Sequence, residues 1–81
     1  MKISVKLFPP LKFEDGTQKK SLEVKEDTDV CDLLALLEYQ CILDPYGKDA
    51  LLILIDGKMA QHSTVLMDAQ TVEVLLFVAG G

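Results

Sequence analysis

The chain has 81 residues, 49% hydrophobic and 26% charged, which is the balance of a folded globular domain rather than of a disordered segment. This length predicts a single domain over residues 1–81, with a flexible C-terminal tail over about residues 78–81. The net charge is −5 and all eight basic residues are lysines, which argues against nucleic-acid binding, because acidic proteins repel phosphates and the arginine fork that reads guanine is missing.

Two segments in the first third of the chain alternate polar and apolar residues, as half-buried strands do. The first covers residues 2–8, and Pro9-Pro10 ends it because proline has no backbone donor. The second covers about residues 19–25 and follows turn residues at Asp15-Gly16. The apolar, inward-facing positions are Ile3, Val5, Leu7, Leu22 and Val24. This pattern predicts a hairpin of two strands joined by a long loop.

The period changes from two to that of a helix after residue 26. Thr28 or Asp29 can accept hydrogen bonds from the free amides of a helix start, where acidic residues also oppose the helix dipole. The apolar stripe consists of Val30, Leu33, Leu34 and Leu37. We therefore expect a helix from about Val30 to Gln40.

The last third of the chain contains two further strand signals. Residues 51–55 are a continuous apolar run that Asp56-Gly57 stops, and residues 58–64 leave room for a very short strand. The final strand, residues 71–78, has Val72, Val74 and Leu76 on one face and Glu73, Leu75 and Phe77 on the other. The resulting order of elements predicts an α+β fold: a ubiquitin-like β-grasp, in which one helix packs across a mixed sheet of four to five strands.

Conventional catalytic signals are missing from the sequence. His62 stands alone in a polar stretch and is interpreted as a surface residue, and no nucleophile, zinc or nucleotide-binding motif is present. Cys31 and Cys41 are expected to be reduced and largely packed thiols. We expect a protein that is not itself an enzyme and binds neither a metal nor a cofactor. The apolar runs are too short to cross a bilayer and no signal peptide is evident, so the expected location is the cytoplasm.

The C-terminus is the segment with the clearest chemical signal. Gly80 and Gly81 follow an apolar strand directly, and glycine lets a backbone enter a channel in which a Cβ atom would collide. An extended tail from Phe77 onward reaches roughly 15 Å at about 3.3 Å per residue. Such a tail can carry a terminal carboxylate into the active site of another protein, although a frayed end would look similar.

A docking surface next to this tail is also indicated. Leu75 and Phe77 occupy outward positions where polar residues are usual, and Leu52 and Leu54 do so on the neighbouring strand. Val78 and Ala79, which lead into the glycines, are expected to contact the same partner. Such patches commonly mark partner surfaces. The alternative is that a loop, or the segment from residue 58 to 66, covers them.

The chain resembles the MoaD/ThiS family of ubiquitin-like sulfur-carrier proteins, which comprises the small subunit of molybdopterin synthase and the thiazole-forming carrier of thiamine synthesis. The matching segments are Met1–Phe8 at the start, Ile55–Lys58 in the middle, and Leu66–Asp68 through Val78–Gly81 at the end. The chain length and the Val-Ala-Gly-Gly ending are more similar to the molybdopterin branch. This sequence has Leu76-Phe77 where that branch usually has two prolines, and Ala69 where the family often has glycine.

The resemblance implies a mechanism centred on Gly81. A partner adenylating enzyme of the ubiquitin-activating type, which uses ATP and Mg²⁺, would convert the Gly81 carboxylate to an acyl-adenylate. A sulfur donor would then leave a thiocarboxylate for an acceptor such as the molybdopterin synthase large subunit. No nucleic-acid or membrane partner is expected.

Three alternatives stay open: a sulfur carrier for thiamine thiazole synthesis, a ubiquitin-like protein modifier joined to lysines through the same glycine, and a β-grasp binding module.

Overall fold

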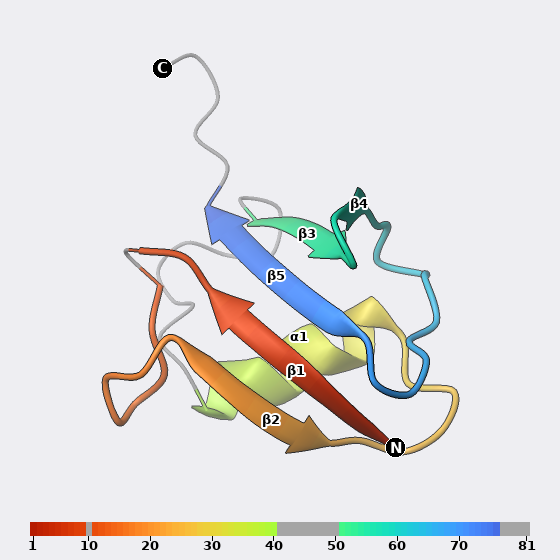
Figure 1. The fold of residues 1–81 in the computed structure, drawn as a ribbon, viewed down its shortest axis with the longest axis horizontal. Helices are drawn as coiled ribbons and strands as arrows, with labels where there is room; N and C mark the ends of the chain where they lie inside the picture. Colours follow the sequence, from red (N-terminus) through yellow and green to blue (C-terminus); the bar gives the residue numbers. More distant parts are fainter. Residues whose placement is uncertain (10, 41–50, 77–81) are drawn as a thin grey trace.

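The computed structural model describes residues 1–9, 11–40 and 51–76, with the backbone alone for residues 38–40. Within these residues, five strands form one sheet and a helix lies across one of its faces (Figure 1). The elements are β1 (Lys2–Leu7), β2 (Lys19–Glu23), α1 (Val30–Gln40), β3 (Leu51–Ile55), β4 (Lys58–Met59) and β5 (Thr71–Leu76). The expected β-grasp order, including the very short strand after residue 57, is confirmed.

The sheet is mixed, with strand order β2-β1-β5-β3-β4. The two central strands, β1 and β5, run parallel, and β2 and β3 pair antiparallel with them from either side. The chain leaves β2 at one edge, passes along α1 and enters β3 on the far side of β5, so α1 lies in a crossover connection as expected. Because of this crossover, β5 returns to the middle of the sheet before its C-terminal end.

The core lies between α1 and the inward face of the sheet. Alternate strand residues and the helical stripe fill it, as the period-two and helical patterns predict. The buried residues are Ile3, Val5, Leu7, Leu11, Phe13, Leu22, Val30, Leu33, Leu34, Leu37, Leu51, Ile53, Ile55, Leu66, Val72 and Val74. Two of them, Leu11 and Phe13, come from the loop between β1 and β2 and were not predicted as core residues.

The start of α1 is fixed by a local cap and by the segment that precedes β5. The Asp29 carboxylate accepts from the backbone N–H of Asp32 at 2.8 Å, so Asp29 is the cap. Val30 and Cys31 donate their backbone N–H groups to the carbonyls of Thr64 (3.0 Å) and His62 (2.9 Å). The segment after β4 therefore lies against the helix start, on the inward side of the sheet.

One expectation for the cysteines is wrong. Cys31 is exposed with a free thiol, because position 31 lies outside the helical stripe that faces the sheet. Cys41 lies outside the described residues. His62 is exposed, as predicted. No helix in the described part of the chain is long and apolar enough to cross a membrane.

Candidate functional site

The outward face of the sheet has an apolar area over β3, β4 and β5. Leu51, Ile53 and Ile55 of β3 point into the core, so the alternating residues Leu52 and Leu54 point outward, where both are half-buried. On β5 the same alternation buries Val72 and Val74 and turns the half-buried Leu75 outward. We call the surface formed by Leu52, Leu54, Met59 and Leu75 the apolar patch.

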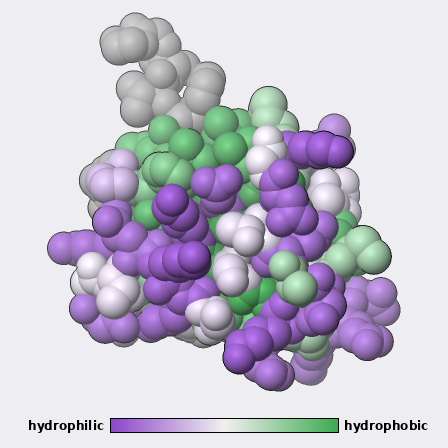
Figure 2. Space-filling view, in the orientation of Figure 1, coloured by the Kyte–Doolittle hydropathy of each residue, from purple (hydrophilic) through white to green (hydrophobic). Residues whose placement is uncertain are grey.

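The strand register brings the residues of this patch together. Leu75 lies directly opposite Leu52 across the β3–β5 ladder, and Leu54 lies opposite Met59 across the β3–β4 ladder. Directly opposed side chains in antiparallel strands contact one another. Met59 is 75% exposed and extends the patch to the sheet edge. In Figure 2 this apolar area is seen beside the end of β5.

The segment from residue 58 to 66 does not cover the patch. Backbone hydrogen bonds join the later part of this segment to the helix start: Leu66 N–H donates to the Thr28 carbonyl at 2.8 Å, next to the two bonds described above. Those bonds hold the segment on the opposite face of the sheet. The apolar patch is therefore left available to a partner by this segment.

The predicted site residues fall into two groups. Leu52, Leu54 and Leu75 are brought together on one surface, as the sequence indicated. The predicted attachment residues Gly80 and Gly81, and the predicted contact residues Phe77, Val78 and Ala79, lie outside the described residues. β5 ends at Leu76, one residue after Leu75, so the patch extends to the C-terminal end of the described residues.

Sequence reasoning did not assign Met59 to the site. The available signal was the Asp56-Gly57 turn, which reverses the chain tightly after β3 and pairs Met59 with Leu54. Gly57 has φ of 85°, a conformation that favours glycine. A two-residue strand has too little pattern for its outward face to be predicted from sequence.

A carboxylate outside the patch has a perturbed pKa. Hydrogen bonds from the Thr17 hydroxyl (2.6 Å) and the Thr17 backbone N–H (3.0 Å), together with the nearby Lys20 ammonium at 3.1 Å, lower the pKa of Asp15 from 3.8 to about 2. Asp15 is exposed in the loop that carries the buried Phe13. Its bonds organise that loop.

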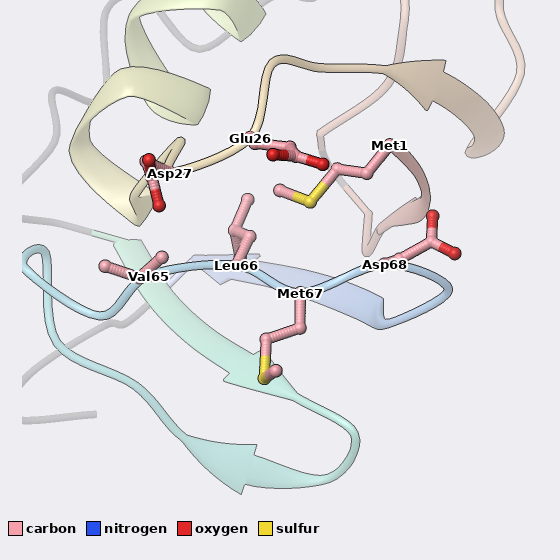
Figure 3. A pocket seen from close by; sticks show the side chains of 7 residues that line it. All are labelled: Met1, Glu26, Asp27, Val65, Leu66, Met67 and Asp68. Atoms are coloured by element: carbon pink, nitrogen blue, oxygen red, sulfur yellow. The ribbon is translucent and has the colours of Figure 1, made fainter.

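A pocket of about 290 Å³ lies at the end of the sheet where β1 begins (Figure 3). It is lined by Met1, Glu26, Asp27, Val65, Leu66, Met67 and Asp68. The Leu66 side chain points into the space beside Glu26 and Met1, whereas Met67 points away from it. Within residues 1–9, 11–40 and 51–76, no group of three or more His, Cys, Asp and Glu side chains could hold a metal ion.

Comparisons with known proteins identify the family. No curated protein matches the chain significantly. Among solved structures, SAMP1 from Haloferax volcanii has a TM-score of 0.70 at 19% identity, and the alignment covers 100% of both chains. The complex of subunits 1 and 2 of molybdopterin-converting factor from Helicobacter pylori 26695 contains a chain with a TM-score of 0.71 at 22% identity, again over 100% of both chains.

A third solved structure is similar to the same extent. The putative molybdopterin converting factor subunit 1 from Pyrococcus furiosus has a TM-score of 0.72 at 22% identity, covering 96% of this chain and 99% of that one. These likenesses support the ubiquitin-like β-grasp fold. The family model of the ThiS family matches residues 5–81, nearly the whole sequence. The chain therefore belongs to the ThiS family of small ubiquitin-like proteins.

Proposed function

We propose that the protein is a sulfur carrier in molybdopterin biosynthesis, which accepts sulfur as a thiocarboxylate on Gly81 and donates it to an acceptor enzyme in the cytoplasm. The observation that carries the proposal is the family match, which runs through Gly80 and Gly81. It is supported by the apolar patch at the end of β5, the strand that leads into the glycines. The chain itself acts as a co-substrate rather than as an enzyme.

The chemistry needs two displacements at the Gly81 carboxyl group. In the first, a carboxylate oxygen attacks the α-phosphorus of ATP, pyrophosphate leaves, and an acyl-adenylate forms. In the second, a hydrosulfide equivalent from the sulfur donor attacks the acyl carbon, AMP leaves, and a thiocarboxylate remains. ATP and Mg²⁺ are held by the adenylating partner. Ionised sulfur is a strong nucleophile near neutral pH, and a tethered sulfur gains the rate advantage of proximity.

The patch has a separate task in this scheme. Each partner must hold the folded body while the tail occupies its active site, and an exposed apolar surface beside the tail supplies that docking energy. The Helicobacter pylori structure is a complex of subunit 1, the chain that is similar to this protein, with subunit 2. By analogy, we propose the corresponding large subunit as the acceptor partner here.

The test uses the adenylating enzyme of the source organism and three proteins: the parent, a Gly81 deletion and Gly80→Val. We expect ATP–pyrophosphate exchange with the parent and loss of exchange with both variants. Deleting one residue shortens the reach by about 3.3 Å, and valine adds a branched side chain that restricts the backbone. Thermal melts should be unchanged, since the variants lie beyond β5. Full adenylation of either variant would contradict the proposal.

A second candidate function is protein modification through the same glycine. It is favoured by the similarity to SAMP1 and to a second solved structure, that of small archaeal modifier protein 1 from H. volcanii. The two functions share adenylation and differ in what takes the acyl group. Covalent adducts between Gly81 and lysines of other proteins in host-cell extracts would indicate a modifier. A thiocarboxylate without such adducts would indicate a dedicated sulfur carrier.

A further inference from the structure

The pocket at the start of β1 has an apolar floor and acidic sides. Leu66 is buried and points into the pocket beside Met1, and Glu26 and Asp27 lie on the opposite side from residues 65–68 (Figure 3). The pocket is open to solvent and has a volume of about 290 Å³. An open pocket of this size suits a side chain presented by another protein better than a small molecule, which is usually enclosed by its site.

Exposed apolar side chains extend the apolar surface of this pocket. Val65 is 51% exposed and Met67 is 66% exposed, and both line the pocket. Within residues 1–9, 11–40 and 51–76, the other large apolar side chain of this kind is Met59, which belongs to the apolar patch. Two such side chains around one apolar pocket, unlike single scattered ones, indicate a contact surface.

Three carboxylates and one ammonium group line the pocket, so its lining has a net charge of −2. The carboxylates are those of Glu26, Asp27 and Asp68, and the ammonium group is the N-terminus at Met1. The ammonium group donates to the Val24 carbonyl at 2.9 Å. The carboxylates of Glu26 and Asp27 have no hydrogen-bond or ion-pair partner in the part of the chain that the structure describes.

The lysines nearest in sequence do not line the pocket. The alternation that buries Ile3 turns Lys2 to the outward face of the sheet, whereas the pocket lies on the helix side. The backbone N–H of Lys2, rather than its ammonium group, donates to the Asp68 carboxylate at 2.9 Å. Lys25 is exposed in the loop before α1 and is not a lining residue. The negative charge of the lining is therefore available to a cationic partner.

We infer that this pocket is a second docking site, which binds a protein segment that carries a leucine-sized apolar side chain between basic residues. The apolar side chain covers Leu66 and contacts Val65, and the basic residues pair with the carboxylates of Glu26 and Asp27. A basic segment also complements the net charge of −5 of the whole chain. This inference goes beyond the proposed function and does not depend on it.

The pocket and the apolar patch can be occupied at the same time. β5 begins at Thr71, three residues after Asp68, and Leu75 lies four residues further along the strand, about 13 Å away at about 3.3 Å per residue. The two surfaces also lie on opposite faces of the sheet, because the segment that contains Leu66 is hydrogen-bonded to the helix start. A partner bound at the pocket therefore leaves the patch free for another protein.

The test uses three peptides, each acetylated and amidated at its ends. The basic apolar peptide is Gly-Arg-Leu-Arg-Gly, and its two controls replace the leucine by serine or both arginines by glutamate. Dissociation constants are measured by NMR titration of the full chain at about 0.1 M ionic strength. We expect a millimolar Kd for the basic apolar peptide, about tenfold weaker binding of the serine peptide, and no binding of the glutamate peptide.

Two double variants of equal charge locate the site. The pocket variant is Glu26→Gln with Asp27→Asn, and asparagine suits the left-handed conformation of residue 27, whose φ is 67°. The control variant is Glu14→Gln with Glu73→Gln, which removes two carboxylates elsewhere, that of Glu73 beside the apolar patch. We expect the pocket variant to bind the basic apolar peptide about fivefold more weakly than the control, and the difference to shrink at about 1 M ionic strength.

The backbone amide shifts in the titration show where the peptide binds. Shifts centred on Asp27, Val65 and Leu66, and unchanged by Leu75→Ala, would support the inference. Shifts centred on the apolar patch would overturn it, as would equal affinities of the three peptides or of the two double variants. None of these measurements involves adenylation of the C-terminus, so failure of this inference and failure of the proposed function are distinguishable.

Discussion

Replacing Ala69 by glycine should stabilise the protein. Ala69 has φ of 67°, the left-handed region, in the turn that precedes β5. Its N–H donates to the Lys2 carbonyl at 2.8 Å, and the neighbouring Asp68 carboxylate accepts from the Lys2 N–H at 2.9 Å, so two bonds to the start of β1 hold this conformation. A residue with a Cβ atom pays about 1–2 kcal/mol for the left-handed conformation, which glycine adopts freely.

The expected gain is smaller than this strain. Glycine also gives the unfolded chain more freedom, which costs the folded state about 0.5–1 kcal/mol. The net stabilisation of Ala69→Gly is therefore about 0.5–1 kcal/mol, or a rise in Tm of roughly 2–8 °C for a domain of this size. Urea and thermal melts of the variant and the parent measure both quantities.

A matched control is available in α1. Ala35 is exposed in the helix interior, where glycine should destabilise by about 1 kcal/mol. The same chemical change thus has opposite signs at the two positions. If Ala69→Gly destabilises the protein as Ala35→Gly does, the left-handed conformation at residue 69 is absent and the reasoning fails.

Three further predictions concern the patch, the helix cap and the loop. Leu75→Ala should lower the free energy of unfolding by about 1 kcal/mol in a urea melt, and should weaken calorimetric binding to the adenylating enzyme by about 2 kcal/mol. The control is Val74→Ala in the fully buried core, which should lower the free energy of unfolding by about 2 kcal/mol and leave binding unchanged. Asp29→Ala should lower the free energy of unfolding by about 1 kcal/mol, with no change if Asp29 is not the cap. The pKa of Asp15 is lower in the folded state, so its contribution to stability is present above pH 3.8 and is lost as the pH falls towards 2. Urea melts across that pH range should therefore show a smaller loss of unfolding free energy for Asp15→Asn than for the parent.

The sequence predicted the elements whose pattern is local. The α1 bounds Val30–Gln40 were predicted correctly, because an acidic cap precedes an apolar stripe at helical spacing. The buried loop residues Leu11 and Phe13 were missed, since burial in a loop follows from tertiary packing and leaves no periodic signal. The exposure of Cys31 was missed because a cysteine was assumed to pack, although its position off the stripe already indicated the solvent face.

The part of the candidate site that depends on local alternation was also predictable from the sequence. Leu52, Leu54 and Leu75 were placed on one outward surface by strand alternation alone. The place of Met59 opposite Leu54 depends on the β3–β4 register, which a two-residue strand leaves undetermined in the sequence. The roles of Gly80 and Gly81 stay predictions, because both glycines lie outside the described part of the chain.

The central claim is that Gly81 carries sulfur. The most direct measurement is the mass spectrum of the C-terminal peptide of the native protein, before and after incubation with the host's adenylating enzyme, ATP and a sulfur donor. The account predicts a fraction heavier by the difference between one sulfur and one oxygen atom, with the added mass on Gly81. A C-terminal carboxylate alone, after incubation with an adenylating enzyme shown to be active, would contradict it.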